Sequence, residues 1–236
     1  MTTATTVTTD TPGAAGEAPG HSQRLRGKIA LVLPELLAAG RALMDHPWIA
    51  ELYPEYLFTL HCMTRASVPL MEAALGQARA LADRDPVAAA LVPYLVKHIP
   101  EERHAHWLLQ DLEVLGFARD EVVQRPPSPT VAALVGSQYY WIFHYHPVAL
   151  LGYMEIAEGY PPTAQQVEAL IARTGYPRNA FRSLSRHARL DLHHRNDLHE
   201  VLDSLPLTPR HSAIIGMSAL QSVHLASLAI GEIAAG

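Results

Sequence analysis

The segment from His187 to His194 carries the residues whose types and spacing are best suited to chemistry. It reads His-Ala-Arg-Leu-Asp-Leu-His-His. An α-helix turns by about 100° per residue, so His187, Asp191 and His194 would lie within about 60° of one another on one face. Two imidazoles and a carboxylate on one face form a mixed nitrogen and oxygen site suited to iron, manganese or zinc. The alternative interpretation is a solvated polar face, because further His, Arg and Asp residues crowd the same segment.

A second group of candidate ligands lies near the middle of the chain. Glu101 and His104 are three positions apart, the spacing that di-iron carboxylate bundles use on their ligand helices. Glu102 and His106 form a competing pair four positions apart, which His98 would extend. Spacing alone does not choose between the two pairs. The start of a helix would explain the glutamates through the helix dipole, but it would leave the histidines unexplained.

Two further stretches supply acids. Glu155 and Glu158 end an otherwise apolar helical segment, where the helix dipole disfavours negative charge, so a buried carboxylate there needs a cationic partner. One of the two is expected to face solvent. Glu72 and His61 would lie about 20° apart on one helix, although a surface glutamate and a core histidine are the simpler interpretation of that pair. A ligand set without thiolates favours a pair of non-haem iron or manganese ions over structural zinc.

These residues are predicted to lie on long helices, because the segments between breaks are rich in Ala, Leu, Glu, Gln and Met and carry apolar residues at three-to-four spacing. Alternating β patterns and internal repeats are absent. The proline-rich and glycine-rich breaks fall at residues 45–47, 83–86, 126–129, 161–163, 175–177 and 206–209. The sequence therefore predicts a single all-α domain over residues 21–236, a bundle of about seven helices.

The ends and the composition narrow the possibilities further. Residues 1–20, rich in Thr, Ala, Gly and Pro, are predicted to form a disordered tail and not a signal peptide. Residues 212–236 approach membrane-spanning length, but polar side chains interrupt them, so a buried core helix is expected and no membrane partner. A net charge of -5 argues against nucleic-acid binding. The single cysteine, Cys62, excludes an internal disulfide and fits a reducing cytoplasm. Phosphate-binding loops, dinucleotide fingerprints, GxSxG and HExxH motifs are missing.

The combined pattern resembles the haem-oxygenase-like di-iron oxidases, also described as iron-containing redox enzymes. The resemblance covers roughly residues 50–205 and is carried by the ExxH element, by Trp107-Leu-Leu-Gln-Asp111, His146-Pro147, Gly152-Tyr153 and Glu158-Gly159, and most specifically by HxxxDxxH. It implies a haem-oxygenase-like helical fold. The iron ligands that it implies are Glu101, His104, Glu158, His187, Asp191 and His194, with Glu72 as a further carboxylate. Arg103 departs from the glycine that close relatives often have there, which bears on whether His104 or His106 is the ligand.

The resemblance also implies an activity. Two Fe(II) ions would reduce O2 to a peroxo-bridged diferric species, and an electron donor would restore the ferrous state. Relatives act on small amines, amino acids or fatty acids in specialised metabolism, so N-oxygenation of a small amine or amino-acid-like compound is expected. Oxidative desaturation and C–C cleavage are the alternatives. The residues expected to line the substrate pocket are Tyr139, Tyr140, His144, Tyr145 and His61, although core packing explains the aromatic ones equally well. The apolar final helix is a candidate homodimer contact.

Three rival functions remain to be tested against the structure. A metal-free, thiaminase-like hydrolase of the same fold would use Cys62 as its nucleophile, although nothing in the sequence marks that thiol as activated. A haem-binding protein would use His61 as its axial ligand and would leave the other acids and imidazoles buried without purpose. A structural helical scaffold would direct the histidines towards solvent.

Overall fold

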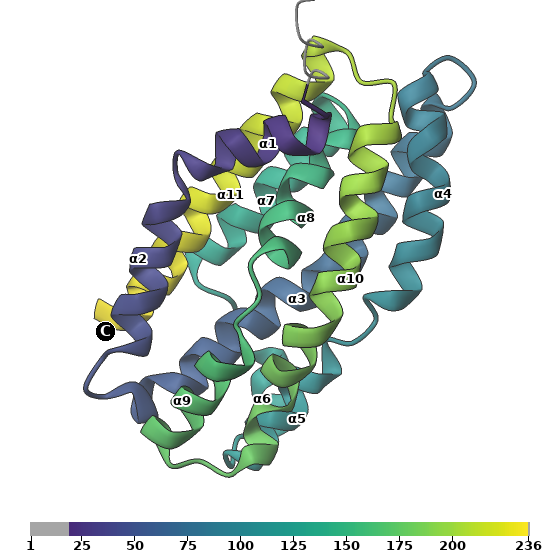
Figure 1. Ribbon diagram of the computed structural model, residues 1–236. Coiled ribbons are helices and arrows are strands. Elements are labelled where there is room, and N and C mark those ends of the chain that lie inside the picture. Colours follow the sequence, from purple (N-terminus) through teal and green to yellow (C-terminus); the bar gives the residue numbers. More distant parts are fainter. Residues whose placement is uncertain (1–18, 236) are drawn as a thin grey trace, which may run out of the picture.

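The computed structural model describes residues 19–235, without the side chains of residues 189–193. The predicted disordered tail, except for its last two residues, therefore lies outside the described part. Within that part the chain is all-α, as predicted, and forms an elongated bundle (Figure 1). The elements are α1 (His21–Ala30), α2 (Leu33–Met44), α3 (Ile49–Leu81), α4 (Pro86–Glu101), α5 (His106–Val114), α6 (Arg119–Gln124), α7 (Pro129–His144), η1 (Pro147–Ala149), α8 (Leu150–Gly159), α9 (Ala164–Thr174), η2 (Arg178–Phe181), α10 (Arg182–Ser204) and α11 (Pro209–Ala235).

The predicted breaks coincide with helix ends that the sequence caps. The side chain of Asp85 caps α4, that of Ser128 caps α7, and Thr163 forms a capping box at the start of α9. Gly175, at φ 68°, ends α9 in the left-handed conformation that glycine adopts without strain. The described residues form eleven α-helices and not about seven, because further interruptions separate α1 from α2, α4 from α5, α5 from α6 and α7 from α8.

The apolar final helix, α11, is a core element. It packs against α2, α7 and α8, and more than half of its most apolar stretch is buried, although its length and composition would allow it to span a membrane. Gly152 of α8 lies so close to α11 that a β-carbon there would come within 2.2 Å of the carbonyl oxygen of Ile215. The prediction of a buried helix thus agrees with the packing.

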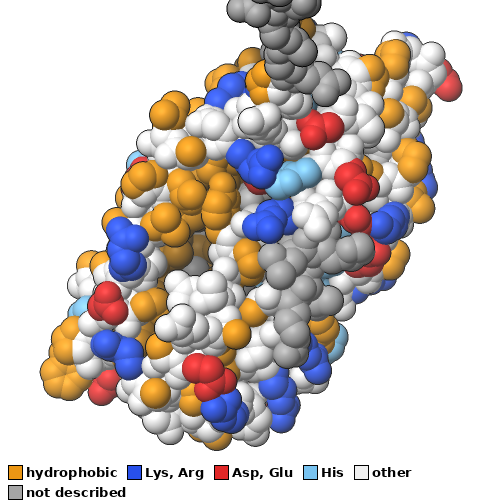
Figure 2. All heavy atoms as spheres, viewed as in Figure 1, with side chains coloured by type: hydrophobic (Ala, Val, Ile, Leu, Met, Phe, Trp, Pro, Cys, Tyr) orange, Lys and Arg blue, Asp and Glu red, His pale blue; other side chains and the backbone are white. Residues whose placement is uncertain are grey.

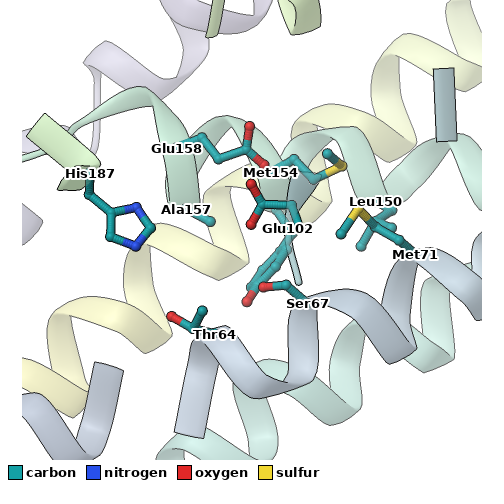
Figure 3. A pocket seen from close by; sticks show the side chains of 10 residues that line it. Thr64, Ser67, Met71, Glu102, Leu150, Met154, Ala157, Glu158 and His187 are labelled. Atoms are coloured by element: carbon teal, nitrogen blue, oxygen red, sulfur yellow. The ribbon is translucent and has the colours of Figure 1, made fainter. Parts of the chain in front are cut away.

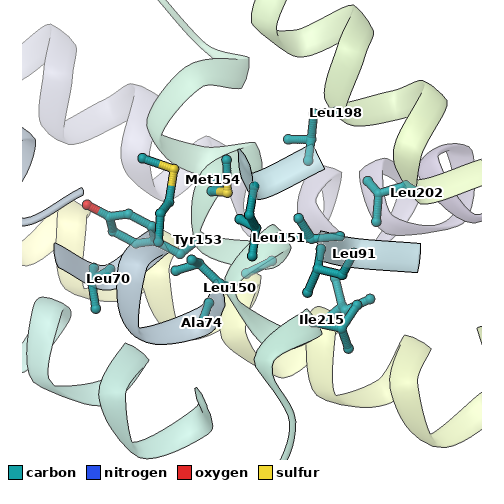
Figure 4. Packing of buried hydrophobic residues seen from close by; sticks show 14 of the residues in the cluster. Leu70, Ala74, Leu91, Leu150, Leu151, Tyr153, Met154, Leu198, Leu202 and Ile215 are labelled. Atoms are coloured by element: carbon teal, nitrogen blue, oxygen red, sulfur yellow. The ribbon is translucent and has the colours of Figure 1, made fainter. Parts of the chain in front are cut away.

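Buried apolar side chains form two clusters. The larger one joins α4, α8, α10 and α11 to the second half of α3, and Figure 4 shows Leu91, Leu151 and Leu198 meeting in it. The smaller one joins the first half of α3 to α5, α9 and η2. Polar and charged side chains cover much of the face drawn in Figure 2, with an apolar hollow beside α2.

Contacts at both ends fix the position of α10, which carries the HxxxDxxH segment. At its start, the backbone N–H of Ser183 donates to Oδ2 of Asp111 on α5, at 2.8 Å. Near its end, the carboxylate of Asp203 accepts hydrogen bonds from the backbone N–H and the hydroxyl of Ser22, at 2.8 and 2.7 Å. Contacts with α5 at its start and with α1 near its end therefore set where His187 and His194 lie.

Candidate metal centre

A short non-helical bridge between α4 and α5 supplies the centre of the candidate site. α4 ends at Glu101 and α5 begins at His106. The N–H of Glu102 still donates to the carbonyl of His98 at 3.2 Å, and the chain then leaves the helix before His104. Glu102 and His104 are both buried. Residues two positions apart on a helix lie about 200° apart around its axis, so a continuous helix could not bury both side chains on one side. The interruption allows both to face the interior.

Glu102 is the carboxylate around which the histidines gather. One of its oxygens lies 3.1 Å from Nδ1 of His194, and the other lies 3.4 Å from Nε2 of His104. Nε2 of His98, one turn earlier on α4, lies 3.9 Å from the same carboxylate. Burial alone would raise the pKa of Glu102, but its contacts with His104 and His194 outweigh burial and hold that pKa well below its ordinary value. The contact with Glu102 in turn raises the pKa of His194.

Glu158 of α8 is the second buried acid of the site. Its Oε1 lies 3.3 Å from Nε2 of His98, and its Oε2 is buried without a hydrogen-bond partner. Burial raises the pKa of Glu158, against the opposing effect of His98. For His98, burial would lower the pKa, but Glu158, Glu102 and Glu101 outweigh that effect and raise it to about 9. His98, Glu102 and Glu158 offer donor atoms that all lie within 4.8 Å of one another.

The histidines of α10 close the site from the other side. The ring of His187 meets that of His104 edge to face, with centroids 4.9 Å apart, and His194 meets His98 in the same manner and at the same distance. His104 also stacks on Trp107, with centroids 4.4 Å apart. The backbone of Asp191 lies on α10 between the two histidines, and its side chain is outside the described residues.

A small cavity of about 50 Å³ lies among these groups (Figure 3). Glu102, Glu158 and His187 line one part of it. Side chains that could orient a bound molecule line a second part: Thr64, Ser67 and Tyr153. Apolar side chains complete the wall: Met71, Leu150, Met154 and Ala157. In Figure 3 the two carboxylates face each other across the space into which His187 points.

The structure separates the competing acids that the sequence left open. Glu158 belongs to the cluster, whereas Glu155, also buried, holds Nε2 of His199 at 3.1 Å from each of its two oxygens. Glu101 is one-third exposed and lies 3.3 Å from Nδ1 of His98, on the outer side of that ring. Donor atoms of Glu101, His98 and His194 also fall within 4.8 Å of one another, so Glu101 lies at the edge of the cluster.

Two other predicted ligand positions lie on the outside. His106, the alternative to His104, is exposed on the first turn of α5. Glu72 is exposed on α3, where Oε1 accepts a hydrogen bond from Arg103 at 3.2 Å. Glu72 is therefore not among the acids that the structure gathers around His98 and His194.

The structure does not bring the predicted pocket residues to this cavity. The helix that was expected to run on to Glu158 breaks at His146-Pro147, which separates α7 from α8. About half of the surface of Tyr140 and of Tyr145 is exposed, and Tyr139 stacks on Phe143 along α7. His144 is exposed and packs against Tyr140. His61 is buried on α3, one turn before Thr64, and burial lowers its pKa.

The ligand set predicted from the sequence did not include His98 and Glu102. Their spacing of four positions is the usual signal for two side chains on one helix face, and it was present beside the competing ExxH pair. The polar wall formed by Thr64, Ser67 and Tyr153 had no signal of its own, because single hydroxyl residues on apolar helices are common in cores.

A second group, Asp85, His146 and His211, also has donor atoms within 4.8 Å of one another. The backbone N–H of Val148 donates to Nδ1 of His146, so the ring proton is on Nε2, which donates to Oδ2 of Asp85 at 3.1 Å. A metal ion on Nε2 would force that proton onto Nδ1, against the Val148 N–H. We therefore assign this group to capping the start of α4.

The chemistry of the main cluster fits iron. Its buried groups are two carboxylates and several imidazoles, a nitrogen and oxygen set suited to iron or manganese. Nδ1 of His104 and Oε2 of Glu158 are buried without hydrogen-bond partners. Leaving such groups unsatisfied costs about 1–3 kcal/mol each, and a bound cation would satisfy them. Cys62 lies in the smaller apolar cluster, away from these groups, and burial raises the pKa of its thiol.

Comparisons with known proteins identify the fold and the family. No curated protein matches the sequence. A domain of unknown function with a haem-oxygenase-like fold from Shewanella denitrificans has a similar structure, with a TM-score of 0.73 and 19% identity over 89% of this chain and 90% of that one. A TenA homolog from Pseudomonas syringae pv. tomato has a TM-score of 0.65 and 13% identity over 95% and 99% of the two chains. These likenesses show the haem-oxygenase-like fold.

The family comparison concerns the sequence itself. Residues 55–226 match the family described as iron-containing redox enzyme. The matched range contains α4, the bridge after it, α8 and the whole of α10, and so every element that carries a member of the cluster. Since the match spans well over half of the chain, the protein belongs to the iron-containing redox enzyme family.

Proposed function

We propose that this protein is a cytoplasmic non-haem di-iron oxygenase that uses O2 to oxygenate the nitrogen of a small amine or amino-acid-like substrate in specialised metabolism. The observation that carries the proposal is the cluster of buried Glu102, Glu158 and three buried histidines, His98, His104 and His194, with the half-buried His187 beside a cavity. Burying ionisable groups costs several kcal/mol each unless they are paired or bind a metal. A helical scaffold without a redox function would have no reason to gather them there.

The residues that would hold the metal ions come from four elements. They are His98, Glu102, His104, Glu158, His187 and His194, with Asp191 and Glu101 as further candidates. When bound, two Fe(II) ions would supply the electrons that activate O2. The family name covers iron chemistry in general, and the absence of thiolates from the cluster supports the non-haem di-iron form of it.

The chain itself would bind and orient the substrate. The hydroxyls of Thr64 and Ser67 line one side of the cavity, and Met71 and Met154 line an apolar side. A substrate held between these walls would present one end to Glu102 and Glu158. The enclosure would keep bulk water from the reacting atoms, which protects a reactive oxidant from side reactions. Oxidative desaturation or C–C cleavage would use the same substrate-binding walls. The identity of the product therefore distinguishes N-oxygenation from these two reactions.

The rival functions have less support. A thiaminase-like hydrolase would need an activated thiol in the cavity, but Cys62 is packed among apolar side chains and its pKa is raised. A haem protein would need space for a porphyrin beside His61, but His61 does not line the cavity among the clustered acids and histidines.

Anaerobic titration with Fe(II) tests the proposal. We expect two irons per chain, a transient visible band on admission of O2, and an electron donor that restores the ferrous state. A Soret peak would indicate haem instead, and a chain that binds no iron would refute the proposal. Products from candidate amines, identified by mass spectrometry, would separate N-oxygenation from desaturation and C–C cleavage.

Variants locate the ligands within that experiment. We expect His187→Ala and Asp191→Ala each to lose iron at one site while the helical circular dichroism is unchanged. Full iron loading and activity in both variants would overturn the assignment of α10. Glu102→Gln is expected to lower iron loading more than Glu101→Gln. The reverse order would identify Glu101 as the ligand, as the ExxH pattern predicts. Glu113→Gln, an exposed acid on α5, serves as the matched control.

A further inference from the structure

An open groove of about 350 Å³ lies outside the cavity. Its walls come from one face of α3 and from the bridge after α4. Thr64 and Glu102 line both the groove and the cavity. The two spaces therefore meet at these side chains, and a molecule in the groove is separated from the cluster only by the layer that contains Glu102.

The rim of this groove carries one positive and one negative side chain. Arg103, from the bridge, contacts Glu72, from α3, through one nitrogen and one oxygen at 3.2 Å. Their side chains are 64% and 52% exposed, so the pair contributes little to stability in water. By contrast, Arg178 and Glu168 form two parallel contacts of 2.6 Å elsewhere on the surface. The single contact leaves guanidinium N–H groups and a carboxylate oxygen on the rim with room for a ligand.

We propose that the groove binds the head group of an α-amino acid, with the carboxylate on Arg103 and the α-ammonium on Glu72. This inference rests on the proposed function and names its substrate class. Arginine binds carboxylates through paired N–H groups, and a carboxylate is the natural partner of an ammonium group. A zwitterion satisfies both side chains, whereas a simple amine or a fatty acid satisfies one. The amino-acid side chain would extend past Glu102 into the cavity, so the reacting atom would belong to the side chain and not to the α-amine.

Binding of small probes tests this assignment without requiring turnover. Isothermal titration calorimetry on the full protein would compare L-lysine and L-norleucine with two fragments of lysine, 1,5-diaminopentane and 6-aminohexanoate, which lack the carboxylate and the α-amine respectively. We expect at least one amino acid to bind, and each fragment to bind about tenfold more weakly than lysine, because each loses one charge-assisted contact at a solvent-screened rim. Binding of neither amino acid, or equal affinity for lysine and its fragments, would overturn the inference.

Single substitutions then locate the site. Arg103→Gln and Glu72→Gln should each raise the Kd of the bound amino acid about tenfold while the iron content per chain is unchanged. Arg178→Gln, in a comparably exposed pair, should leave the Kd unchanged. Unchanged affinity in the first two variants would overturn the inference even if iron loads normally. Failure of the wild type to bind iron would refute the proposed function. It would not change the calorimetric result, which tests the groove separately.

Discussion

Asp111 holds the start of α10 and does so as a fully buried carboxyl group. Its Oδ2 accepts the N–H of Ser183, and its Oδ1 has no hydrogen-bond partner. Burial is the largest influence on it and, despite hydrogen bonds from the backbone at the start of α10, raises its pKa from 3.8 to about 6. This acid is therefore a good place to test how the helix that carries His187 and His194 is held.

The sign of the pH effect follows from proton binding. Between pH 4 and pH 6 the carboxyl is ionised in the unfolded chain but retains its proton in the folded one, so the folded state binds more protons and stability falls as pH rises. A shift of about two pKa units at about 1.4 kcal/mol per unit gives a cost of up to about 3 kcal/mol above pH 6. The dipole of α10 is already part of the environment that favours the anion, and it limits the cost.

Asp111→Asn removes the charge and keeps a carbonyl acceptor for Ser183. We expect the free energy of unfolding at pH 7.5 to exceed that of the wild type by about 1–3 kcal/mol, and the difference to shrink towards zero at pH 4. Urea unfolding followed by circular dichroism, repeated from pH 4 to pH 8, measures this difference. Asp111→Ala, which lacks the acceptor, should be about 1–2 kcal/mol less stable than the Asn variant. An Asn variant that is less stable than the wild type at pH 7.5, by an amount independent of pH, would refute the reasoning.

Two further predictions concern packing and capping, and thermal or urea unfolding checks both. Gly152→Ala should lower the free energy of unfolding by about 1–3 kcal/mol, because its β-carbon would collide with the Ile215 carbonyl of α11. Gly136→Ala, with open space around its β-carbon, should be neutral or stabilising by about 0.5–1 kcal/mol, and equal effects would contradict the packing argument. Asp85→Ala should cost about 1–2 kcal/mol, because α4 loses its cap and His146 its acceptor. Wild-type stability in that variant would show that the cap contributes nothing.

The local sequence predicted the helices well because their signals are local. Proline, glycine and capping residues mark where helices end, and the breaks at residues 83–86, 126–129 and 161–163 coincide with capped helix starts. His187 and His194 lie seven positions apart within one unbroken helix, so their common face followed from helical geometry alone. The structure places both rings against histidines from α4 and from the bridge.

The relative orientation of side chains on opposite sides of a helix break could not be predicted in the same way. The ExxH pattern assumes that Glu101 and His104 share a helix, but α4 ends at Glu101. Nothing in the spacing indicates where that helix stops, because the bridge is determined by what packs around it. The aromatic residues of α7 were expected to lie on the same helix as Glu158, but that helix ends before His146-Pro147 and α8 begins at Leu150.

The bridge of residues 102–105 also means that the rotation of α5 about its own axis does not depend on the rotation of α4. Within a helix, one inserted or deleted residue would rotate everything beyond it by about 100° and would carry the buried rings out of place. After the Glu102 N–H, which still donates to the carbonyl of His98, the chain leaves the helix and can absorb such a change in a loop. The exposed face of α5 can therefore change in composition while Asp111 on its buried face keeps its contact with Ser183 and His98 keeps its orientation. The break after α4 therefore makes the orientation of His98 independent of the direction in which α5 leaves the bridge.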